Sequence, residues 1–201
     1  MTDKQILLWI KKELGKSIAE AIEIKKPSPL ITESVLAAIA FREVGFLLHK
    51  YVAAKTNFEA ICSLMKGDLS KRDGETEKSY HGFSFWQIDV NTDLAFIKTG
   101  EWEIPLKACK TAIEILQRKM NCFTAAFTGK DLLRVSIAAY NCGEGNIRKA
   151  IIKGYSVSEL IDNNDDDNIE AKHFDIDIYT FNKDYSKEVL RFKELYESIQ
   201  L

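Results

Sequence analysis

Glu43 is the residue whose type and surroundings best suit acid catalysis. A helix turns by about 100° per residue, so Glu43 falls on the same helical face as Leu36, Ile39, Ala40 and Leu47. Apolar surroundings disfavour an ionised carboxylate and should raise its pKa, which keeps the group protonated near neutral pH. Such an acid can protonate the oxygen that departs when a glycosidic bond breaks. The alternative is a glutamate at a helix end that turns to water.

A second group of polar side chains lies among aromatic residues in the segment HGFSFWQID. Gln87 can donate to and accept from sugar hydroxyl or acetamido groups, and Asp89 can position a water molecule. Aromatic faces that can pack against sugar rings are supplied by Phe83, Phe85 and Trp86. A buried strand with a polar end would have the same composition, so this alternative stays open.

A third group follows an apolar helix in the segment AAYNCGEGN. Tyr140 and Asn141 end the helix, and the two glycines after them predict a tight corner between helices. By themselves these residues are equally typical of an ordinary helix end with a glycine turn.

The elements that must position these residues are mostly helical. Amphipathic spacing and capping residues predict helices over residues 3–25, 32–44, 92–98, 105–120, 130–140, 146–152 and 182–198. The polar segment 66–80 predicts a surface loop or short hairpin, and 81–89 an extended or irregular segment. An acidic run at 162–168 predicts a solvated loop. We therefore expect a mainly α fold with a small irregular or β segment near 66–90.

The composition of the chain limits the kinds of partner and ligand that it can bind. The chain has 201 residues, which suits a single domain with a continuous core, and a formal net charge of -2. This charge argues against a nucleic-acid partner, which needs a dense basic surface. Four cysteines without a CxxC pair and three isolated histidines argue against a metal site, and buried free thiols are favoured over disulfides. Nothing in the sequence indicates a cofactor.

In this order and at these separations, the three segments resemble the catalytic core of soluble lytic transglycosylases and goose-type lysozymes. AFREVGF around Glu43 is similar to the helix that bears the family's catalytic glutamate. GFSFWQID at 82–89 is similar to its glycine-rich segment ending in Met-Gln-Ile or Met-Gln-Val, and AAYNCGEGNIRKA at 138–150 to its Ala-Tyr-Asn-Ala-Gly-x-Gly-Asn motif. The segment DYSKEVLRF at 184–192, which contains Tyr185, is similar to the closing helix of that family.

This resemblance implies a two-lobed, lysozyme-like α fold that cleaves the β-1,4 bond between N-acetylmuramic acid and N-acetylglucosamine in peptidoglycan. It divides a single domain, 1–201, into an N-terminal helix at 1–30, a catalytic core at 31–152, and an acidic loop with a closing helix at 153–201. Glu43 would be the acid, and Gln87, Tyr140 and Asn141 would line the cleft together with Tyr185. The departures from the family pattern are Ser84 in place of glycine, Phe85-Trp86 in place of Leu-Met, and Cys142 in place of alanine, and they change the cleft wall.

Hydrolysis and transglycosylation differ in their need for a second carboxylate. An inverting hydrolase holds a water with a second carboxylate about 6.5–9.5 Å from the acid, whereas a transglycosylase needs a single acid because a hydroxyl of the substrate attacks. Asp89 follows the Gln-Ile pair as in goose-type lysozymes, Asp68 follows a glycine as in that family, and Asp73 precedes one. We expect an inverting muramidase that uses Asp68, Asp73 or Asp89, with a lytic transglycosylase as the alternative.

Other classes of protein fit the same sequence. One is a non-catalytic glycan-binding or interaction module, in which the loop 66–80 or 162–168 receives a partner such as a proteinaceous inhibitor or immunity protein. The apolar run at 6–10 is too short for a secretory signal peptide, and no stretch reaches the roughly 18 apolar residues of a membrane span. We therefore expect action in the periplasm or outside the cell, after delivery by a specialised secretion system or phage-type lysis.

Overall fold

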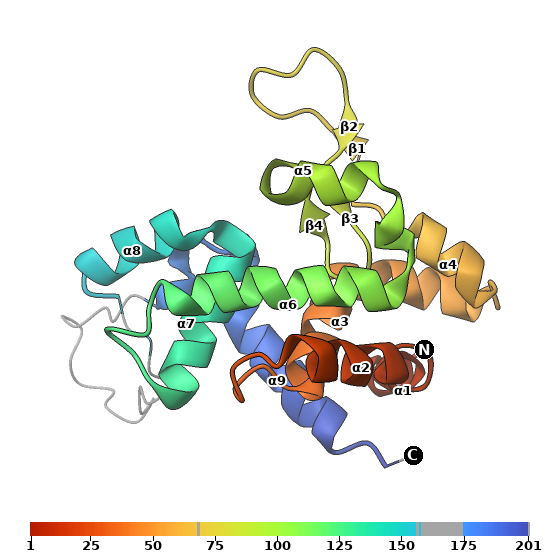
Figure 1. Ribbon diagram of the computed structural model, residues 1–201, viewed down its shortest axis with the longest axis horizontal. Helices are drawn as coiled ribbons and strands as arrows, with labels where there is room; N and C mark the ends of the chain where they lie inside the picture. Colours follow the sequence, from red (N-terminus) through yellow and green to blue (C-terminus); the bar gives the residue numbers. More distant parts are fainter. Residues whose placement is uncertain (68, 156, 158–174, 201) are drawn as a thin grey trace. The chain divides into compact units, whose positions relative to one another are not determined.

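The computed structural model of the chain describes residues 1–67, 69–155, 157 and 175–200. Helices form 67% of these residues, which confirms the prediction of a mainly helical fold. The described elements, drawn in Figure 1, belong to two compact units. The first is Met1–Glu114 with Arg191–Leu201, and the second is Ile115–Leu190. None of the described helices has the length and apolar composition that crossing a bilayer requires. The predicted acidic loop at 162–168 lies outside the described residues.

Two short helices open the first unit where the sequence predicts one. α1 (Asp3–Glu13) begins with a capping box, in which Thr2 accepts from the Gln5 amide and the Gln5 side chain accepts from the Thr2 amide. α2 (Gly15–Lys25) follows after a break at Leu14. Glycine is a poor helix former, and the bend at this point allows both helices to pack on α3. The expected single helix over 3–25 is therefore wrong.

The long helix α3 (Glu33–Ala53) forms the centre of the first unit. It begins as expected at Thr32, whose side chain accepts from the Val35 amide. The expected end near residue 44 is wrong, because Gly45 continues the helix instead of ending it. A Cβ atom at Gly45 would lie 3.3 Å from the Phe41 ring, so glycine here leaves room for that ring beside the helix.

The segment between α3 and the next long helix carries two small hairpins. After α4 (Phe58–Leu64), β1 (Leu69–Ser70) pairs antiparallel with β2 (Ser79–Tyr80), which confirms the expected short hairpin. β3 (Gly82–Phe83) then pairs antiparallel with β4 (Ile88–Asp89), with Gly82 opposite Asp89. α5 (Val90–Lys98) contacts this second hairpin. Figure 1 draws the strands and α5 together on the side away from α1 and α2.

The first unit also contains the residues that come just before and just after the second unit in the sequence. η1 (Glu101–Glu103) leads to α6 (Pro105–Asn121), which proline opens as expected because its fixed φ suits the first helical position. The part of α6 from Ile115 onward belongs to the second unit. The end of the chain returns to the first unit, where Phe192 packs edge-on against Phe41 with ring centroids 4.4 Å apart.

The second unit contains α7 (Gly129–Cys142) and α8 (Glu144–Ile152), joined at Gly143. Gly143 has a φ of 82°, a conformation that glycine adopts without strain, which explains the predicted corner. The short helices η2 (Ile176–Tyr179) and η3 (Phe181–Lys183) precede α9 (Tyr185–Glu197). The predicted start of this last helix at Asn182 is wrong, because Asn182 and Lys183 have left-handed φ values of 57° and 59°.

Candidate active site

Glu43 lies inside α3, far from either end, and its side chain is half-buried. The alternative of a glutamate at a helix end is therefore wrong. Most residues expected on its face are fully or partly removed from water, as Leu36 is 1% exposed and Ile39 is 0% exposed. The Glu43 side chain is therefore neither fully exposed nor fully enclosed by the core.

The turn between β3 and β4 has a strained backbone. Ser84 and Gln87 have φ values of 70° and 46°, in the left-handed region that favours glycine. The Ser84 hydroxyl accepts from the Trp86 amide at 3.2 Å and so helps to hold the turn. Non-glycine residues in such conformations cluster at functional sites, where the surrounding fold maintains them. The surrounding fold therefore holds this turn in one conformation next to α3.

Trp86 attaches this turn to the helix that carries Glu43. Its indole Nε1 donates to the backbone oxygen of Leu36 at 2.9 Å. Leu36 and Glu43 are seven residues apart, which places them on nearly the same helical face and about 10 Å apart along the axis. The turn and the candidate acid therefore lie on the same side of α3.

Three side chains predicted to contact a substrate are instead buried in the core of the first unit. Ser84 and Trp86 are 0% exposed, and Phe85 is 2% exposed. The Phe85 ring stacks on Phe58 with centroids 6.4 Å apart and also contacts Trp9. Because no face of these rings is open to a polymer, we leave Ser84, Phe85 and Trp86 out of the candidate site.

Gln87 is half-buried, and its amide group is enclosed by backbone. Its Nε2 donates to the Ser84 backbone oxygen at 2.9 Å. Its Oε1 lies beside Gly67 and Gly82, such that a Cβ atom at Gly67 would be only 2.6 Å from it and one at Gly82 would overlap it. The two glycines thus provide the space that the Gln87 amide occupies. The side chain fixes the turn rather than extending into solvent.

Asp89, the first candidate for the second carboxylate, is half-buried and already hydrogen-bonded. The two terminal guanidinium nitrogens of Arg72 donate to Asp89. Nη1 lies 3.2 Å from Oδ1, and Nη2 is in close contact with Oδ2. Its Oδ1 also accepts from the Asn91 amide at 2.8 Å and caps α5. Burial opposes ionisation of Asp89, but these hydrogen bonds and the Arg72 charge outweigh it and hold its pKa below the usual range.

Two further titratable groups join this ion pair at the base of the first hairpin. Glu75 accepts from the Arg72 amide at 2.7 Å, and its carboxylate lies 3.3 Å from Nε2 of His81. His81 is 6% exposed, and within the described part of the chain its Nδ1 has no hydrogen-bond partner. The side chains of Arg72, Glu75, His81 and Asp89 therefore meet in one polar cluster, which links the loop of the first hairpin to β4.

Of the other two candidates for the second carboxylate, the structure describes only Asp73, which is not part of this cluster. Asp73 is exposed in the loop of the first hairpin. Asp68 lies outside the described residues. Within the described ranges, no group of three or more His, Cys, Asp or Glu side chains is arranged to hold a metal ion.

The remaining predicted site residues belong to the second unit. Tyr140 and Asn141 are half-buried at the end of α7, and the Asn141 side chain accepts from the Phe181 amide at 2.9 Å. This bond ties the end of α7 to η3. Tyr185 is 1% exposed, so its ring is part of the core of this unit and offers no surface to a ligand.

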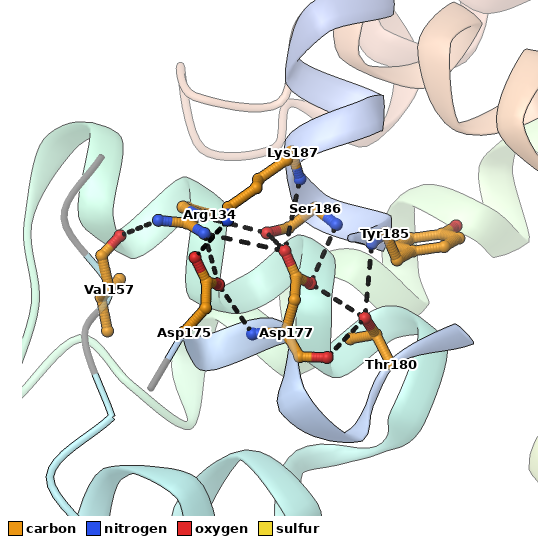
Figure 2. A network of polar contacts seen from close by, with 8 residues as sticks. All are labelled: Arg134, Val157, Asp175, Asp177, Thr180, Tyr185, Ser186 and Lys187. Atoms are coloured by element: carbon orange, nitrogen blue, oxygen red, sulfur yellow. Dashed lines mark hydrogen bonds and ion pairs between the residues drawn. The ribbon is translucent and has the colours of Figure 1, made fainter. Parts of the chain in front are cut away.

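A buried ionic network in the second unit was not expected from the sequence (Figure 2). Arg134 of α7 is 2% exposed and donates to the backbone oxygen of Val157 at 2.7 Å, to Asp175 at 2.6 Å and to the Ser186 hydroxyl at 3.2 Å. Its Nη2 also lies 3.7 Å from Asp177. The arginine within the apolar run LLRVSIAA is the sequence feature that could have predicted this network, because a buried arginine needs a carboxylate partner.

Asp177 links this network to the start of α9. It is 0% exposed and accepts from the Ser186 amide at 3.0 Å, the Ser186 hydroxyl at 2.6 Å and the Thr180 hydroxyl at 3.1 Å. The first amides of a helix have no partner within it, so a buried carboxylate at this position satisfies them and interacts favourably with the helix dipole. The network holds η2, α7 and α9 together.

Comparison with protein families gives no match to any family model, and comparison with curated proteins gives no match either.

Proposed function

We propose that this protein cleaves the glycan strands of peptidoglycan at the β-1,4 bond between N-acetylmuramic acid and N-acetylglucosamine. Glu43 is the general acid in this proposal and protonates the departing glycosidic oxygen. A two-lobed, lysozyme-like fold, in which Tyr140 and Asn141 belong to the glycan-binding residues, is part of the same proposal. The resemblance of three sequence segments to goose-type lysozymes and soluble lytic transglycosylases suggested it.

One observation carries the proposal: a half-buried glutamate lies in the middle of an apolar helix, on the side where a strained turn is attached. Partial burial on a mostly apolar face disfavours the ionised form of a carboxyl group. A general acid must hold its proton until the glycosidic oxygen departs, so this position of Glu43 on α3 supports the proposal.

The proposed reaction is an inverting hydrolysis in which Asp89 holds the attacking water. The low pKa of Asp89 keeps it ionised at neutral pH, as a base requires. Its hydrogen bonds with Arg72 fix its orientation.

The same hydrogen bonds favour a second candidate reaction. Arg72 and the Asn91 amide together engage both oxygens of Asp89, which weakens it as a base. A lytic transglycosylase needs no second carboxylate, because a hydroxyl of the muramic acid residue attacks and an anhydro end forms. Glu43 then acts alone, first as acid and then as base.

The test compares wild-type protein with Glu43→Gln and with a matched control, Glu20→Gln, on α2. Glu20 is exposed, so its change should leave activity within twofold or so of wild type. Glu43→Gln keeps the shape of the side chain but removes the proton donor, and it should lower the rate of sacculus digestion by about a hundredfold or more. Equal activity of the Glu43→Gln variant and wild type would exclude Glu43 as the acid.

The ends of the released muropeptides distinguish the two reactions. Mass spectrometry should detect reducing ends after hydrolysis and 1,6-anhydro ends, lighter by one water, after transglycosylation. Wild-type protein that sediments with sacculi but releases no fragments is instead a glycan-binding module. Protein that neither binds nor cleaves sacculi contradicts the whole proposal.

A further inference from the structure

The exposure of α3 changes along its length. Its first turns are buried on nearly all sides, whereas its second half presents a strip of residues to solvent. Phe46 lies in this strip and is 85% exposed. Phe41, one turn and a residue earlier, is 5% exposed and packs against Phe192. The helix thus buries one phenylalanine in the core and leaves the other outside it.

Phe46 makes none of the aromatic contacts that hold the other rings of α3 in place, as far as the described residues show. Among the residues that the structure describes, no aromatic ring stacks on Phe46 and no cation lies over it. Phenylalanine is also a weaker helix former than alanine, leucine or lysine. Neither packing within the protein nor helix propensity favours this ring. Its apolar surface would be removed from water if a ligand covered it.

We propose that Phe46 is the platform on which a pyranose ring of the glycan strand stacks, next to the bond that Glu43 cleaves. This inference rests on the proposed function. Residues three apart in a helix have Cβ atoms about 5–6 Å from one another, so a sugar on the Phe46 ring lies within reach of the Glu43 carboxyl group. Phe46 therefore sets the position of the substrate, while Glu43 supplies the proton.

The surroundings of Phe46 favour a sugar over a protein partner. On the helix, the positions beside it are occupied by polar or charged residues, Arg42, Glu43, His49 and Lys50. A protein-binding surface has several apolar residues at its centre, and a single exposed ring falls short of that. A pyranose has an apolar C–H face and an edge of hydroxyl groups, which match one aromatic face surrounded by hydrogen-bonding side chains.

The experiment changes Phe46 in wild-type protein and in the inactive Glu43→Gln background. Phe46→Trp keeps a flat face, Phe46→Leu keeps apolar area without one, and Phe46→Ala removes both. The matched control is Ile152→Ala, which removes an apolar side chain that is also 85% exposed. In the Glu43→Gln background, Phe46→Ala should raise the protein concentration for half-maximal binding to sacculi by about three- to tenfold. Phe46→Leu should weaken binding almost as much, whereas Phe46→Trp and Ile152→Ala should not.

In the active background, Phe46→Ala should raise KM by a similar factor and leave kcat within about twofold, because the ring binds the substrate before and during reaction alike. Its thermal stability should match wild type, because few contacts are lost.

If Glu43→Gln is inactive but Phe46→Ala binds and cleaves like wild type, the platform is refuted and the proposed function survives. If Glu43→Gln is fully active, or wild type neither binds nor cleaves sacculi, both are refuted. Self-association of wild type that Phe46→Ala abolishes in sedimentation velocity, with glycan binding unchanged, assigns the ring to a second copy of the chain and refutes the platform.

Discussion

Replacing Asp177 with asparagine removes a negative charge from the buried network but keeps the size and shape of the side chain. Asparagine fits the same space, but its amide nitrogen would face donors at the start of α9, including the Ser186 amide and hydroxyl. Arg134 would keep Asp175 and lose its second carboxylate. Breaking a buried ion pair on one side costs about 3–5 kcal/mol, of which each lost hydrogen bond to a charged group accounts for about 1.5–3 kcal/mol. We therefore expect Asp177→Asn to lower the free energy of unfolding by roughly 3–5 kcal/mol.

Urea denaturation followed by circular dichroism measures this change, and a thermal melt should show a fall in Tm of roughly 10 °C for a chain of this size. The control is Asp131→Asn on α7, where the aspartate is exposed and the expected change is within about 0.5 kcal/mol. If Asp177→Asn unfolds at the same urea concentration as the control, the carboxylate does not stabilise α9 through its charge. The reasoning from burial and hydrogen bonds would then be refuted.

Two further predictions concern titratable groups. Burial opposes ionisation of Asp89, yet the hydrogen bonds from Arg72 keep its pKa lower in the folded than in the unfolded chain, so its stabilising effect is complete above about pH 4 and is lost as the pH falls through the folded-state pKa. Urea titrations over this acidic range should therefore show a smaller pH-dependent loss of stability in Arg72→Gln than in wild type, and equal losses would contradict the pairing. Burial raises the pKa of Cys62 to about 11, whereas Cys122 is exposed. Mass spectrometry after brief alkylation near neutral pH should find Cys122 modified well before Cys62, and equal rates would contradict the described burial.

The sequence predicted most helices because their signals are local. Thr32 and Pro105 began helices as expected, since a capping oxygen and a fixed φ act within one turn. The errors came from interactions between distant segments. Gly45 lies within α3 beside the Phe41 ring, where a Cβ atom would be crowded, and the break at Leu14 lets two helices pack on a third. Neither effect is visible in a window of neighbouring residues.

The candidate site was predicted less completely than the fold. The apolar face around Glu43 follows from helical spacing alone, and most of the residues on that face are buried. The sequence did not indicate that Trp86 belongs to the core, because an aromatic residue beside polar ones fits a sugar-binding wall and a buried turn equally well. Arg72 was missed because its partner Asp89 is 17 residues away, across both hairpins. The exposure of Phe46 depends on which helices cover α3.

The space for the Gln87 amide has an evolutionary consequence. Residues 67, 82 and 87 form a set in which a side chain at either glycine occupies the volume of the carboxamide. In homologous chains that keep glutamine at this position, Gly82 should be retained most strictly, because a Cβ atom there would also crowd Cδ and Cβ of Gln87, whereas at Gly67 it would crowd only the amide oxygen. A chain that gains alanine at one of them should at the same time replace glutamine by a shorter residue, so these three positions should change together rather than one by one.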